Sequence, residues 1–145
     1  MAACARAQEF LAGSSVVASQ SPAYWVHEGA LDMQRSLFLC LLDKPKDAVE
    51  AAGNAMARFD RTYVVSYGRC QVRLGHALVL SKEITEAAHV LGDAVSLATH
   101  SPRLTAELHT VRVLMQPWEN THAVATLDAR LEACRLAPTT CPTPG

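Results

Sequence analysis

The sequence contains little of what sheet proteins and nucleic-acid binders usually need. It has a single isoleucine, Ile84, and only 6% aromatic residues, whereas its 145 residues include 24 alanines and 17 leucines. Isoleucine, threonine and aromatic residues favour strands, while alanine and leucine favour helices, so this composition predicts an all-α fold. The net charge of -1 lacks the basic excess of a free-standing nucleic-acid-binding domain. The scarcity of aromatic rings also argues against a surface on which bases stack.

The five cysteines form no recognisable framework. Their number is odd, their spacing is irregular and no CxxC pair occurs, which indicates a reducing compartment rather than disulfides or a zinc site. No run approaches the roughly 18 to 20 apolar residues of a membrane span. Arg6 and Glu9 interrupt the N-terminal stretch where a signal peptide needs its apolar run. We therefore expect a cytoplasmic protein with no membrane partner.

Catalytic and metal-binding motifs are also missing. The patterns HExxH, GxSxG, GxGxxG and GxxxxGK[ST] do not occur. No two of the six histidines stand at the i, i+4 spacing that directs two side chains to one metal. Cys70 and His76 lie six residues apart on one predicted helix, which does not align them as a nucleophile and base. We expect no metal, no cofactor and no catalytic residue, and we interpret the cysteines as small buried residues.

Prolines and capping residues divide the chain into helices. Ser21-Pro22 and Ser101-Pro102 each place a capping serine before a proline at the first helical position. Between such breaks apolar residues recur every three or four positions, which is typical of amphipathic helices. The predicted helices, seven in all, lie near residues 2–12, 23–42, 46–59, 63–80, 83–99, 102–116 and 121–136.

This pattern predicts three regions. Residues 1–20 form a short N-terminal helix and a linker, and residues 21–136 form a helical-repeat domain. Residues 137–145 hold three prolines and no core residues, so we expect a disordered tail.

The last six predicted helices pair into hairpins with the small-residue spacing of a tetratricopeptide repeat. Small residues let two paired helices approach closely, and the alanine at 48 recurs after 39 and then 36 residues, near the period of about 34. The matching positions of the three units are Ser36 and Ala48, Gly75 and Ala87, and Ala123 and Leu127. We therefore predict antiparallel helical hairpins stacked as a short, tetratricopeptide-like right-handed superhelix.

Several short motifs follow one another in a characteristic order. They are Ser21-Pro-Ala-Tyr-Trp25, Phe59-Asp-Arg-Thr-Tyr63, Arg73-Leu-Gly-His-Ala77, Ser101-Pro-Arg-Leu104 and Leu114-Met-Gln-Pro117. This set resembles the C-terminal tetratricopeptide-like region of actinobacterial helix-turn-helix regulators of the xenobiotic-response-element type, over about residues 21–131. In such regulators a DNA-binding domain precedes helical repeats that dimerise and bind signalling peptides, partner proteins or small effectors.

The resemblance does not extend to DNA binding. Residues 1–20 are too short for a helix-turn-helix, which needs two helices of proper length and a turn. The chain is then a fragment of a regulator, a truncated descendant or a stand-alone repeat protein, and we expect no direct nucleic-acid binding by it.

The first helix of each stacked hairpin would line a concave face, where helical repeats bind their ligands. Arg69 and Arg112 can fork onto a carboxylate such as a peptide C-terminus, and His76 would add a charge adjustable near neutral pH. Counting from Gly75, the candidate groove residues are Arg69, Val72, His76, Leu108, Arg112, Met115 and Gln116. The same residues also have an ordinary interpretation as helix surface, and Leu108 as core.

Tyr24, Trp25 and Met33 are secondary candidates for ligand contact, although a cap packed on the linker accounts better for the two aromatic rings. The predicted function is a non-enzymatic interaction or sensor module that binds a peptide, a protein or a small effector and forms a homo-oligomer. The alternative is a stand-alone helical protein whose closed small-molecule pocket uses His76 for simple acid–base chemistry.

Overall fold

The computed structural model describes residues 22–136, and for residues 22–27 the backbone alone. This range consists of helices and their connections without any strand, so the all-α prediction is confirmed. The predicted helix at 2–12, its linker and the tail at 137–145 lie outside the described residues. No helix within residues 22–136 combines the length and the apolar character needed to cross a membrane.

The observed helices begin and end within three residues of the predicted boundaries. In chain order they are α3 (Pro22–Leu41), α4 (Pro45–Arg58), α5 (Val64–Leu80), α6 (Ile84–Ala98), α7 (Pro102–Leu114), the short 3-10 helix η1 (Gln116–Trp118) and α8 (His122–Ala133). The predicted cap at Ser101 is present, because its side chain accepts a hydrogen bond from the Leu104 N–H at 3.3 Å.

The same kind of turn joins the two helices in each of the first two hairpins. Asp43 and Lys82 both adopt left-handed backbone conformations, with φ of 56° and 62°. After α5, the Glu83 N–H donates to the carbonyl of Leu78 at 3.0 Å, and the equivalent bond closes α3. Such a turn pairs carbonyls at the end of a helix that would otherwise lack partners. The two turns lie 39 residues apart, which agrees with a repeated structural unit.

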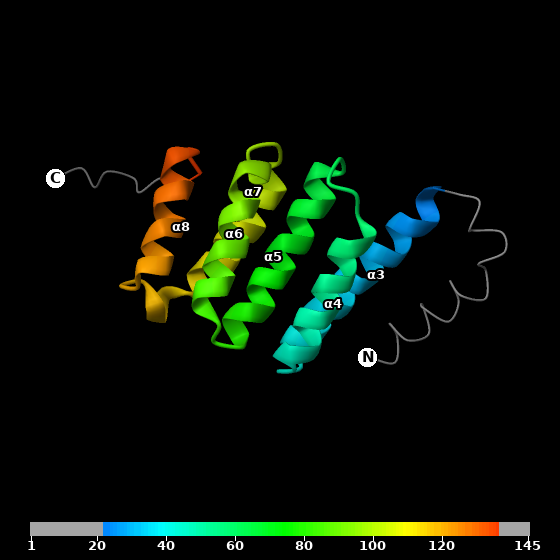
Figure 1. Cartoon of the computed structure of the whole chain (residues 1–145), viewed down its shortest axis with the longest axis horizontal. Coiled ribbons are helices and arrows are strands. Elements are labelled where there is room, and N and C mark those ends of the chain that lie inside the picture. The colour runs from blue at the N-terminus through cyan, green and yellow to red at the C-terminus, as the bar shows by residue number, and fades with distance from the viewer. Residues whose placement is uncertain (1–21, 137–145) are drawn as a thin grey trace.

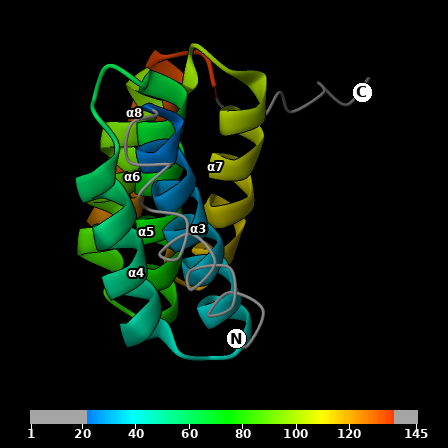
Figure 2. The same cartoon turned by 90° about the vertical axis from the view of Figure 1, so that its right-hand side faces the viewer.

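The helices form two layers, with α3, α5 and α7 in one and α4, α6 and α8 in the other (Figures 1 and 2). α3 packs on α4 and α5 packs on α6, so the first two hairpins are as predicted. The third pair is more open: α7 packs on α5 and α6, α8 packs on α6, and α7 and α8 barely approach each other. The connection between them contains η1, whose Trp118 packs against the core.

Small residues set the spacing between the paired helices. A methyl group added to Gly75 would stand 2.5 Å from Cδ2 of Leu91, so α5 and α6 can be this close only with glycine there. In the first hairpin Ser36 takes the corresponding place and donates a buried hydrogen bond of 2.9 Å to the carbonyl of Ala48. The close contacts predicted for these two units are therefore present.

Candidate functional site

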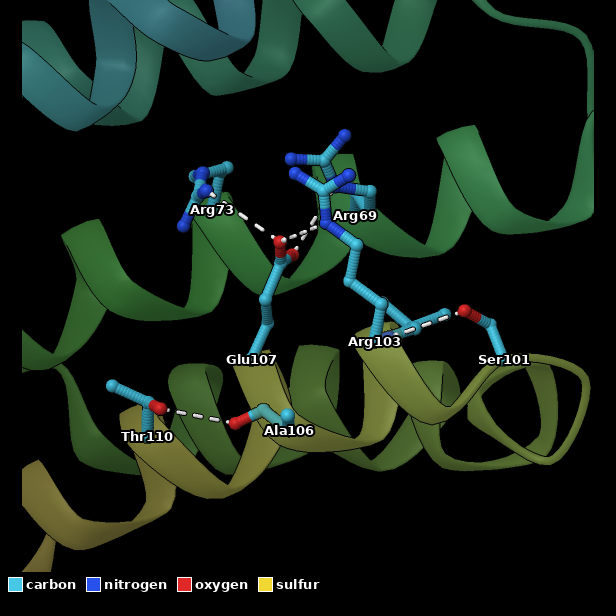
Figure 3. Close-up of polar contacts among 8 residues, drawn as sticks. Arg69, Arg73, Ser101, Arg103, Ala106, Glu107 and Thr110 are labelled. Atoms are coloured by element: carbon cyan, nitrogen blue, oxygen red, sulfur yellow. Dashed lines mark hydrogen bonds and ion pairs between the residues drawn. The ribbon is translucent and has the colours of Figure 1, made fainter.

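Three arginines converge on one glutamate between α5 and α7 (Figure 3). Arg69 Nε donates to Glu107 Oε2 at 3.2 Å, Arg103 Nε lies 3.6 Å from Glu107 Oε1, and Arg73 Nη2 lies 4.0 Å from the same oxygen. Arg69 and Arg73 stand one turn apart on α5, as do Arg103 and Glu107 on α7. We call these four residues the arginine cluster.

The arginine cluster carries more positive than negative charge, because three guanidinium groups share one carboxylate. The contacts of Arg73 and Arg103 with Glu107 are long for hydrogen bonds, so both retain N–H donors for a further acceptor. Arg73 is the most buried of the three, with 14% of its side chain exposed, against 73% for Arg103.

Burial lowers the pKa of the Arg73 guanidinium, although Glu107 opposes this effect. Arg69 and Arg103 act in the same direction as burial. An added anion beside Arg73 would relieve this unfavourable environment. The geometry is therefore suited to a carboxylate or another negatively charged group.

His76 and two cysteines lie near Arg73. Burial, together with the charge of Arg73, lowers the pKa of His76, so His76 does not add the positive charge expected near neutral pH. Burial raises the pKa of Cys40 to about 11 and that of Cys70 to about 12. Thiols of this kind are protonated and unreactive at neutral pH, as expected for small buried residues.

Arg112 lies at a different place on α7 and faces α8. Its Nε and Nη2 donate to the two carboxylate oxygens of Asp128 at 2.6 and 2.7 Å. These hydrogen bonds raise the pKa of Arg112 although burial opposes them. Because Asp128 already occupies the guanidinium fork, Arg112 does not join Arg69 in holding a ligand carboxylate.

The Arg112–Asp128 pair borders a pocket of about 450 Å³ between α7 and α8. This α7–α8 pocket is lined by His109, Arg112, Val113, Gln116, Glu119, Asp128, Leu131 and Glu132. Its lining includes three acidic residues, Glu119, Asp128 and Glu132, beside apolar surface, whereas the predicted groove combined apolar positions with basic ones. Gln116, the first residue of η1, is exposed at this pocket.

Three of the predicted groove residues belong to the hydrophobic core instead. Val72, Leu108 and Met115 have no exposed surface, and all three lie in the main core cluster. Their side chains hold neighbouring hairpins together and cannot contact a ligand in an open groove. Among the secondary candidates, Met33 is also buried, in contact with Cys70 and Phe59, and the side chains of Tyr24 and Trp25 lie outside the described residues.

The predicted set omitted Arg73, Arg103 and Glu107, which complete the arginine cluster with Arg69. The i, i+4 spacing of 69 with 73 and of 103 with 107 was a signal that each pair shares one helix face. That the two faces meet depends on the packing of α7 against α5, which spacing does not reveal.

No family model, curated protein sequence or solved structure matches the chain. Within the described range, no three histidine, cysteine or acidic side chains lie close enough together to hold a metal ion. The function is therefore inferred from the geometry of the arginine cluster and the α7–α8 pocket.

Proposed function

We propose that the chain is a non-enzymatic helical-repeat interaction module that binds a negatively charged group of a peptide, partner protein or small effector on the face of α5 and α7. The observation that carries this proposal is the set of three arginines around the single carboxylate of Glu107. Guanidinium groups bind carboxylates and phosphates through paired, charge-assisted hydrogen bonds. Arg69 and Arg73 are fixed by the helix and partly desolvated, which strengthens such bonds.

The order of short motifs supports a more specific setting, a cytoplasmic actinobacterial transcriptional regulator. In that setting the repeats would be its effector and dimerisation region, and an anionic ligand on the α5–α7 face would alter the DNA affinity of a separate domain. The chain itself would bind no nucleic acid.

Fluorescence anisotropy with a labelled hexaglutamate peptide tests the binding proposal, with hexaglutamine as the neutral probe. We expect the acidic peptide alone to bind, and Arg69→Gln combined with Arg103→Glu to weaken its binding by about tenfold or more, because bonds to charged groups contribute about 1.5–3 kcal/mol each. Arg130→Glu is the control, since it reverses an exposed charge on α8, in the other layer.

Circular dichroism of each variant checks that the helices are retained. Equal weakening by Arg130→Glu would mean that the peptide responds to net charge alone. Undetectable binding of hexaglutamate to the unmodified chain would count against the proposal itself.

The α7–α8 pocket supports a second candidate, a small-molecule binding protein. Its volume of about 450 Å³ lies in the range of about 300–1,000 Å³ that ligand pockets occupy. The histidine at this pocket is His109, not His76, so the pocket gives no support to acid–base chemistry by His76. A thermal-shift screen of small organic cations, repeated with Val113→Arg to obstruct the pocket, distinguishes this candidate from binding at the arginine cluster.

A further inference from the structure

The first helices of the three hairpins carry one packing stripe in common. In α5 and α7 its positions follow a spacing of four, three and four residues, which places them on one helix face. The stripe residues are Cys70, Leu74, Ala77 and the C-cap Ser81 of α5, and Leu104, Leu108, Val111 and the C-cap Met115 of α7. Cys70 and Ala77 contact the first hairpin, so this face packs on the preceding unit.

The same spacing recurs on α3, which has no preceding helix in the described part of the chain. There the stripe consists of Leu31, Arg35, Phe38 and Leu42. Phe38 is 40% exposed, whereas Ala77 and Val111 at its matching positions are 0% and 2% exposed. Leu42 is 51% exposed, whereas Met115 at its matching position in α7 is fully buried. We call Leu31, Arg35, Phe38 and Leu42 the α3 stripe. Its exposed apolar side chains, Phe38 and Leu42, are stabilised when another element covers them.

The opposite end of the stack is formed by α7 and α8 (Figure 1). The surface that would receive a further helix there is the α7–α8 pocket, where the charged residues Arg112, Glu119, Asp128 and Glu132 lie beside the apolar Val113 and Leu131. Polar outer faces are typical of the terminal units that close a repeat stack. The α3 stripe of a second copy would remove these charges from water, so head-to-tail stacking of copies is disfavoured.

We propose that residues 3–11 of the same chain cover the α3 stripe, in the place that α4 takes beside α5. Apolar residues at 3, 4, 7 and 11 repeat the spacing of residues 51, 52, 55 and 59, small residues followed by one large residue. Ala55 of α4 and its C-cap residue Phe59 contact Cys70, a stripe residue of α5. Ala7 and Leu11 occupy the corresponding positions of the N-terminal segment, and Arg6 and Glu9 fall outside the apolar face.

The connecting chain is long enough for this arrangement. Residues 13–21 are nine residues, which span up to about 30 Å when extended. The 20 residues of α3 measure about 30 Å along the helix axis. Residues 3–11 can therefore run antiparallel to α3 and reach Phe38 and Leu42 near its end.

Hydrogen–deuterium exchange on the full chain tests this inference. We expect the amides of residues 3–11 to exchange at least tenfold more slowly than in an unstructured peptide, at all protein concentrations. The double variant Phe38→Glu/Leu42→Glu should abolish this protection, because two charges then face the apolar segment. Val113→Glu/Leu114→Glu is the matched control, since it adds two charges at exposed apolar positions of α7.

Leu11→Asp provides an independent variant that leaves the described helices untouched. It should also remove the protection and should make the amides near Phe38 exchange faster. Free exchange of residues 3–11 in the unmodified chain would overturn the inference, as would protection that survives Phe38→Glu/Leu42→Glu. Protection that disappears on dilution would assign the α3 stripe to a second copy of the chain instead.

Discussion

Arg112 and Asp128 form a two-pronged hydrogen-bonded ion pair between two helices whose backbones barely approach each other. In the first two hairpins small residues bring the paired helices close together, and in the first hairpin Arg58 of α4 also donates a hydrogen bond to Asp32 of α3 at 2.8 Å. Between α7 and α8 this pair spans the side of a pocket, so it adds a direct contact between two helices that otherwise meet through the shared hydrophobic core.

Replacing Asp128 with asparagine should lower the free energy of unfolding by about 1 kcal/mol, because the pair is well aligned but partly exposed. Urea denaturation measures this change. Asp93→Asn is the control, since Asp93 makes only long ion-pair contacts, at 3.6 Å with Arg130 and at 3.8 Å with His89. A double-mutant cycle with Arg112→Gln should assign most of the loss to the pair, and equal losses in Asp128→Asn and Asp93→Asn would contradict this role.

Gly75→Ala should destabilise the chain by about 1–3 kcal/mol, because the added methyl group would meet the fully buried Leu91. Gly53→Ala on α4 makes the same chemical change with nothing within 4 Å of the added atom. It should raise stability by about 0.5–1 kcal/mol through helix propensity alone. Thermal unfolding of the two variants should therefore show shifts of opposite sign, and an unchanged or raised stability of Gly75→Ala would disprove the close contact.

Lys82→Gly should stabilise the fold by about 0.5–1 kcal/mol, since glycine adopts a left-handed conformation without the strain that a side chain causes there. The φ of Lys82 is 62°, and its side chain is exposed, so no packing is lost. Lys46→Gly, within α4, should instead lower stability. Chemical denaturation compares the two, and a loss of stability in Lys82→Gly would contradict the observed turn.

Stability should fall when the pH drops below the ordinary histidine pKa of 6.5, because the folded state holds the pKa of His76 below that value. The unfolded chain then takes up a proton that burial and the nearby Arg73 disfavour in the folded chain. The contribution of neutral, buried His76 to the free energy of unfolding is fully present above pH 6.5, and it is lost as the pH falls through the lowered pKa of His76. His76→Gln should lose less stability than the unmodified chain between about pH 7.5 and pH 5.5, as measured by urea denaturation.

Local sequence signals predicted the helices well and the site only in part. The Ser101-Pro102 cap and the apolar stripe of α6 depend on neighbours along the chain, so both were visible in the sequence. The helical period also placed Val72 and Leu108 on one face of their helices. It could not reveal that a neighbouring hairpin covers that face, which makes them core residues.

The charged contacts depended on tertiary structure in the same way. The meeting of Arg69 with Glu107 requires α7 to lie against α5, and that of Arg112 with Asp128 requires the spacing that accompanies η1. The sequence therefore located basic residues on the correct helices but could not assign their partners.

The two buried thiols between α3 and α5 can report how often the first two hairpins separate. Cys40 packs beside Ala77 and Cys70 beside Met33, so each thiol sits at the junction of the first two hairpins. With a pKa of about 11 and about 12, neither forms the reactive thiolate while the helices are together. The rate at which an alkylating reagent modifies Cys40 and Cys70 at neutral pH therefore measures how often the two hairpins separate, and no label has to be added to the protein.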